Sequence, residues 1–100
     1  MEIFDVNTIR LITLEGKKNK LNNLLKKINK NILDEAELGN WSCTIFLSIL
    51  DYKKDLMVDA INILTNSLGY KASITPGSHE NNLIYMLNIS WEKEEEEHVN

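Results

Sequence analysis

The sequence predicts one small domain of the α/β (α+β) class, a two-layer sandwich in the order helix–strand–helix–strand–strand. Two segments carry apolar residues at helical spacing, and three segments alternate apolar with polar residues. The length of 100 residues suffices for one core. A strand–helix–strand unit is normally parallel, and the last two strands follow each other as a hairpin. We therefore expect two helices on one face of a three-stranded mixed sheet.

The first helix is expected over about residues 7–37. Its apolar stripe has the spacing i, i+3, i+4, i+7, i+11 and i+15, and consists of Leu21, Leu24, Leu25, Ile28, Ile32 and Ala36. Asp5 or Asn7 suits the N-cap, and Gly39 suits the C-terminal cap. Gly16 costs about 1 kcal/mol in a helix interior. The segment is therefore either one long helix or a short helix that breaks near Gly16.

The remaining elements follow from alternation and from turn residues. A strand is expected over residues 41–49, and a second helix between a cap at Asp51 and a stop at Gly69. A short strand over residues 70–75 should end at a turn-rich loop, from Pro76-Gly77 through Asn82. Residues 83–91 form a longer strand. The inward positions of these strands include four aromatic residues, which are Trp41, Tyr70, Tyr85 and Trp91.

Residues 1–91 make up this single domain, and residues 92–100 (EKEEEEHVN) hold five acids and too few apolar groups to bury, so we expect a disordered acidic tail. The longest apolar run, Leu83–Leu87, is far shorter than the roughly 20 residues that span a bilayer. Glu2 and Asp5 stand where a signal peptide would be basic. We therefore expect a cytoplasmic protein without a membrane partner.

No residue pattern predicts an enzyme. Cys43 lies on the inward face of a strand, where a thiol is inert. Ser78, His79 and Glu80 are consecutive, so they cannot face one another as a catalytic triad. One cysteine and two histidines do not match a zinc site, and the acidic run that ends at His98 offers no fixed coordination shell. We expect no catalytic residue, no metal and no cofactor.

Basic residues gather on the first helix. Residues 10–30 hold seven basic residues and one acid, although the whole chain has a net charge of −4. Lys20, Lys26, Lys27 and Lys30 lie opposite the apolar stripe. They form a solvated face, a surface for an anionic ligand or partner, or a nucleic-acid surface. We favour the first reading, because no aromatic residue between Asp5 and Asn40 offers a stacking platform for bases.

The uncovered face of the sheet is expected to carry three large apolar side chains, Phe46, Ile84 and Met86. Burying them between two copies predicts a homo-oligomer, with any ligand site at or near the subunit boundary. The expected ligand-binding residues are basic groups for an anion, aromatic groups for stacking, and one loop histidine. They are Arg10, Lys17, Lys18, Lys20, Trp41, Tyr70, His79 and Trp91.

Three local patterns carry a resemblance. The Lys-rich helix ends at Gly39-Asn40-Trp41, the second helix ends in Leu68-Gly69-Tyr70, and the fold closes on Ile89-Ser90-Trp91. Over roughly residues 5–91 the chain resembles small accessory proteins encoded by bacteriophages of low-GC Gram-positive hosts. The polyglutamate extension after Trp91 departs from that pattern.

The resemblance implies a protein made in the cytoplasm of the infected bacterium. Its implied work is counter-defence or host takeover by binding and neutralising a host factor, either a host protein or a nucleotide-like immune signal. It implies no catalytic residues. Two alternatives stay open: a nucleic-acid-binding modulator that uses the basic helix, and a virion or assembly component.

Overall fold

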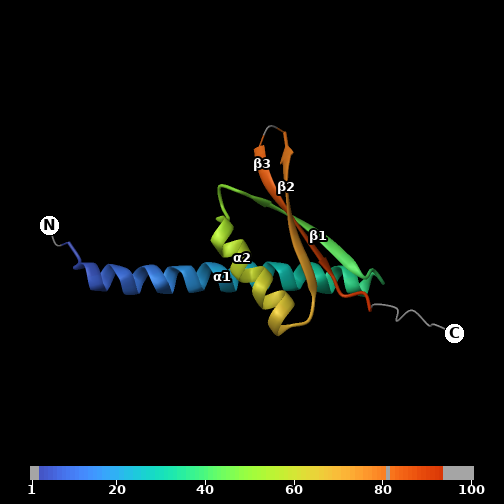
Figure 1. Cartoon of the computed structure of the whole chain (residues 1–100), viewed down its shortest axis with the longest axis horizontal. Coiled ribbons are helices and arrows are strands. Elements are labelled where there is room, and N and C mark those ends of the chain that lie inside the picture. Colours follow the sequence, from blue (N-terminus) through green and yellow to red (C-terminus); the bar gives the residue numbers. More distant parts are fainter. Residues whose placement is uncertain (1–2, 81, 94–100) are drawn as a thin grey trace.

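The computed structural model describes residues 3–80 and 82–93 and has the predicted α+β element order. Both helices pack on one face of a three-stranded sheet (Figure 1). The elements are α1 (Val6–Glu37), β1 (Ser42–Ser48), α2 (Lys54–Asn62) with its π-helical continuation η1 (Ile63–Ser67), β2 (Lys71–His79) and β3 (Asn82–Ser90). Residues 94–100 of the expected acidic tail lie outside the described residues.

The sheet has the strand order β1–β3–β2, and both of its pairings are antiparallel. The prediction of a mixed sheet is therefore wrong, because neither pairing is parallel. β1 and β2 do run in the same direction, but β3 lies between them, with Leu87 opposite Ile45 on one side and Ile74 on the other. Leu87 and Ile89 are buried, so the most apolar strand takes the central position, where both of its edges are hydrogen-bonded.

Helix α1 is continuous through Gly16, which decides between the two sequence-based alternatives. Asp5 is its N-cap and accepts a hydrogen bond from the Thr8 backbone N–H at 2.8 Å. The helix ends in a Schellman turn: Gly39 has φ +87°, and the Asn40 N–H donates to the Glu35 carbonyl at 3.0 Å. Both predicted caps of α1 are thus confirmed.

The expected cap of the second helix at Asp51 is wrong, because α2 begins only at Lys54. The backbone N–H groups of Asp51 and Tyr52 donate to the Ser48 carbonyl at 3.2 and 3.0 Å, and so hold the chain in a turn. Lys53 is the N-cap of α2 instead. Gly69, with φ +82°, ends the helical segment as predicted.

The loop expected between Pro76 and Asn82 is wrong, because β2 continues to His79 and pairs with β3 along its whole length. β2 is an edge strand, where the missing N–H of Pro76 is tolerated. The chain reverses beyond His79, where Glu80 has φ +49°. The end of the sheet at this hairpin extends beyond both helices (Figure 1).

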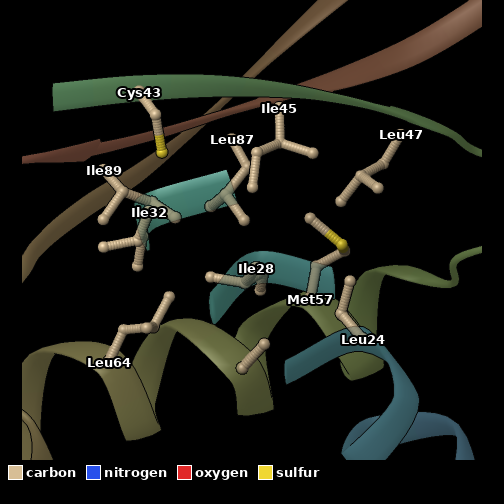
Figure 2. Close-up of a cluster of buried hydrophobic side chains, with 11 residues drawn as sticks. Leu24, Ile28, Ile32, Cys43, Ile45, Leu47, Met57, Leu64, Leu87 and Ile89 are labelled. Carbon is tan, nitrogen blue, oxygen red and sulfur yellow. The ribbon is translucent and has the colours of Figure 1, made fainter. Parts of the chain in front are cut away.

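The core lies between the helices and the inner face of the sheet, and Figure 2 shows its side chains pointing toward one another. Every buried side chain among the described residues is apolar or is the thiol of Cys43. The core residues are Leu24, Ile28, Ile32, Cys43, Ile45, Leu47, Met57, Ala60, Leu64, Leu87 and Ile89. Trp41 was expected to face inward but is 58% exposed, because it follows the Schellman turn and precedes β1. Tyr70, Tyr85 and Trp91 are half-buried against this core.

The molecule is elongated because the N-terminal half of α1 runs clear of the other elements (Figure 1). It measures 73 × 34 × 24 Å, and its radius of gyration of 17.4 Å exceeds the ~13 Å of a compact domain of this length. Every residue from 9 to 20 is exposed. We call residues 3–16 the arm. No helix among the described residues is long and apolar enough to cross a membrane.

Candidate binding groove

A groove of about 420 Å³ separates α1 from the end of the second helix. Its walls are apolar and its rim on α1 is polar. The apolar wall residues are Leu25, Ile28, Ile32, Leu64, Leu68 and Tyr70, and the rim residues are Asn22, Lys26 and Asn29. The volume lies within the range of roughly 300–1,000 Å³ that is usual for ligand pockets.

Helical spacing on α1 explains one side of the groove. Asn22, Lys26 and Asn29 lie at i, i+4 and i+7, so they line up along one side of the helix, next to the core stripe. Leu25 lies between this polar row and the buried Ile28. This side of the groove therefore changes from polar to apolar across the width of the helix, with two amides and an ammonium group beside hydrocarbon side chains.

The other side of the groove depends on the π-helical turn η1. The Leu68 N–H donates to the Ile63 carbonyl at 3.1 Å, and the Tyr70 N–H donates to the Leu64 carbonyl at 2.9 Å. These wide backbone rings turn Leu64 into the core and leave Leu68 60% exposed at the mouth of the groove. Isolated π-helical turns are frequent at functional sites.

The three aromatic residues predicted for the site are connected beside this groove, Tyr70 and Trp91 through their rings and Trp41 through its backbone. The rings of Tyr70 and Trp91 meet edge to face, with centroids 6.5 Å apart and planes at 90°. The backbone N–H of Trp91 donates to the Trp41 carbonyl at 3.0 Å, which joins the start of β1 to the end of β3 at this corner. Tyr70 belongs to both the groove and this aromatic corner.

The predicted basic residues lie elsewhere. Arg10 is on the arm, and Lys17 Nζ lies 3.8 Å from Asp55 Oδ2 at the junction of α1 and α2. Along α1, Lys20 is about 26 Å from the end of the helix near Trp41, at 1.5 Å per residue. Within one chain, therefore, the basic and aromatic residues do not converge. Lys18 is exposed, and the side chain of His79 is outside the described structure.

Sequence reasoning missed Lys26 as the basic residue of the groove, together with its neighbours Asn22 and Asn29. Their i, i+4, i+7 spacing beside the apolar stripe was a usable signal. The position of η1, which makes the opposite wall, depends on tertiary packing and left no comparable signal in the sequence.

A second hollow, of about 290 Å³, lies where the arm leaves the body. One side is α1, at Thr13, Gly16 and Lys20. The other side is the turn after β1 and the start of α2, where Leu56 is half-buried. Its charged lining combines three lysines with three aspartates, which are Lys17, Lys20, Lys53, Asp51, Asp55 and Asp59.

The apolar side chains on the outer face of the sheet are less exposed than expected. Phe46 is 62% exposed, but Ile84 and Met86 are half-buried. Met86 lies over Gly77, since a Cβ added there would be 3.4 Å from Met86 Cε. Because Gly77 has no side chain, the end of Met86 packs over its backbone. Phe46 is then the most exposed of the three predicted apolar side chains on this face.

Cys43 is buried, and burial together with the negative charge of Glu35 raises the pKa of its thiol. A raised pKa disfavours the thiolate that nucleophilic chemistry needs. Within residues 3–80 and 82–93, no group of three or more His, Cys, Asp or Glu residues is arranged to hold a metal ion. No family model, curated protein or solved structure matches this chain.

Proposed function

We propose that this chain is a non-enzymatic bacteriophage accessory protein that captures a host factor in the groove between α1 and η1 and thereby neutralises it. The observation that carries the proposal is the groove itself: an open apolar trough with a polar rim on one wall. Sites of this composition bind by burying an apolar group and orient it with a few polar contacts.

The lining favours a particular target chemistry. Leu25, Leu68 and Tyr70 offer hydrocarbon and an aromatic ring to an apolar side chain. Lys26 supplies one positive charge, and the neighbouring amides donate and accept hydrogen bonds. A single ammonium suits one carboxylate better than the several charges of a nucleotide phosphate. We therefore propose a host protein that presents an apolar segment with an adjacent acidic residue.

The open length of the groove suits a helical segment. Its lining on α1 runs from Asn22 to Ile32, which is about 15 Å of helix. Leu68 in the lining is 60% exposed, and Leu33, which follows Lys26 and Asn29 at i+7 and i+4 on α1, adds a 53% exposed apolar side chain beyond the groove lining. An amphipathic helix that lays its apolar face into such a trough is a common mode of recognition.

Mass spectrometry of material that co-purifies with the protein from host cells tests the proposal. We expect one host protein to be retained by the wild type and lost from Leu68→Asp and Lys26→Glu. Leu50→Asp is the matched control, because Leu50 is 91% exposed in the turn after β1 and far from the groove lining. Retention of a nucleic acid or a small molecule instead, or equal retention by all variants, would contradict it.

A further inference from the structure

The arm leaves an unusual amount of apolar surface in solvent. Seven large apolar side chains between residues 3 and 14 are each 44% to 85% exposed, and they are Ile3, Phe4, Val6, Ile9, Leu11, Ile12 and Leu14. Val6, Ile9 and Ile12 share one side of the helix, whereas Leu11 and Leu14 lie on the other side. Exposed apolar patches on a protein surface mark places that bind a partner. A helix also gains most of its stability from packing, which the arm lacks within one chain.

Gly16 is a second, independent observation. It lies inside the continuous helix, has no positive φ, and a Cβ there would meet nothing within 4 Å. Neither backbone geometry nor crowding within the chain therefore requires glycine here, although glycine is less favourable than alanine in a helix. Glycine in a helix surface lets another backbone or side chain approach closely.

The residues around Gly16 form one sector of the helix. At about 100° per residue, Asp5, Ile9, Ile12, Thr13, Gly16 and Lys20 fall within a sector of roughly 100°. From Ile9 onward their spacing is i, i+3, i+4, i+7 and i+11, as in helices that pair. We call these six residues the pairing face. Its Gly16 end forms one side of the second hollow, next to Leu56.

The charges on the pairing face are self-complementary in only one orientation. Asp5 is at one end and Lys20 is at the other, with Lys17 at the edge of the face beside Lys20. Two parallel copies would set acid beside acid and lysine beside lysine. In two antiparallel copies, Ile9 lies opposite Gly16, Ile12 opposite Thr13, and Asp5 opposite Lys20.

We propose that two copies of this chain pair through their arms in an antiparallel, two-fold symmetric contact, in which each Ile9 packs at Gly16 of the partner copy. Each arm then runs along the second hollow of its partner, where Leu56 provides apolar surface. A two-fold contact uses the same face on both copies and closes on itself, so it yields a dimer. The groove between α1 and η1 stays open on each body, so this inference is independent of the proposed function.

Light scattering after size exclusion tests the pairing on the full chain at tens of micromolar. The wild type should have twice the chain mass of 11.5 kDa. Ile9→Asp and Ile12→Asp should be monomers. Leu11→Asp is the matched control, because Leu11 is 69% exposed but lies about 150° round the helix from the centre of the pairing face. Thermal melting of each variant checks that the body, which these side chains do not contact, keeps its fold.

Cysteine cross-linking tests the direction of pairing. In the proposed dimer the two copies of residue 13 are beside the symmetry axis, whereas the two copies of residue 20 are about 22 Å apart along the helices. Oxidation should therefore link Thr13→Cys into a covalent dimer and leave Lys20→Cys unlinked, while Cys43 is buried and does not interfere. A monomeric wild type, a linked Lys20→Cys dimer, or loss of the dimer in Leu11→Asp would each overturn the proposal.

Discussion

The ammonium group of Lys27 lies over the ring of Tyr52, 5.7 Å from its centre. This contact joins the exposed side of α1 to the turn that precedes α2. Cation–π contacts at exposed sites stabilise a fold by about 0.5–1 kcal/mol. Lys27 therefore helps to hold α1 against this turn. Its neighbour Ile28, which is buried in the core, contributes far more to the packing of the fold.

Ile28 and Lys27 test the helical register. Ile28 is 1% exposed in the core, so Ile28→Asp should lower the free energy of unfolding by more than about 3 kcal/mol. Lys27→Asp should cost about 1 kcal/mol, mainly through the lost contact with Tyr52. Urea denaturation measures both, with the exposed Lys30→Asp as a further control. Equal losses for Ile28→Asp and Lys27→Asp would contradict the register.

The basic face of α1 predicts weak binding to nucleic acid. Lys17 is paired with Asp55 and Lys27 is placed over Tyr52, so part of the charge already has a partner within the chain. We expect no appreciable binding of DNA or RNA in about 150 mM salt, measured by fluorescence anisotropy. Sub-micromolar, salt-sensitive binding that disappears when Lys20, Lys26, Lys27 and Lys30 are all replaced would contradict this.

Cys43 predicts a decline of stability at alkaline pH. Its thiol pKa is raised in the folded state, above the ordinary value of 9.0, by burial and by Glu35. The folded protein thus holds the thiol proton more tightly than the unfolded chain, and that stabilisation is full below the unfolded pKa and falls as the pH rises through and above it. Urea denaturation from about pH 8 to about pH 10.5, a range that brackets the ordinary thiol pKa of 9.0, measures the slope.

Cys43→Val is the control for this slope, because it keeps an apolar side chain of similar size at the same position. Its stability should change less over the same alkaline range than that of the wild type. In the wild type, a thiol reagent should also modify Cys43 slowly until the protein unfolds. Rapid modification of the native protein at neutral pH would show that the thiol is accessible.

Alanine substitutions at Gly16, inside α1, and at Gly39, which follows its C-terminal end, should change the stability of the protein in opposite directions. Gly16→Ala should stabilise the helix by about 0.5–1 kcal/mol, since the backbone is helical and the space is open. Gly39→Ala should destabilise the protein by about 1 kcal/mol, because φ is +87°. Both are measured by thermal melting in the monomeric Ile12→Asp background, which separates helix propensity from pairing. The same sign for both would contradict the two backbone assignments.

The sequence predicted the features that depend on local periodicity and local chain geometry. The spacing of Leu24, Ile28 and Ile32 correctly identified the buried side of α1, and the caps at Asp5 and Gly39 were both correct. Alternation likewise identified Cys43 as an inward residue. Each of these depends on residues a few positions apart.

The features that sequence reasoning missed depend on contacts between distant segments. Pro76 signalled a loop, but its edge position in the sheet makes it compatible with a strand. Lys26 joins the groove only because η1 packs opposite it. The exposed apolar residues of the arm keep a helical spacing, and only the packed structure shows that no other part of the described chain covers them.

The central place of β3 also sets the order in which this fold can be completed. Within residues 3–80 and 82–93, β1 and β2 each have β3 as their only hydrogen-bonded neighbour in the sheet, yet β3 is synthesised after both of them. While residues 82–90 are still missing from a growing chain, neither ladder can form, and Ile45 lacks its partner Leu87. The helices can form locally during synthesis, but the sheet must wait for its final strand and then close on both sides of it.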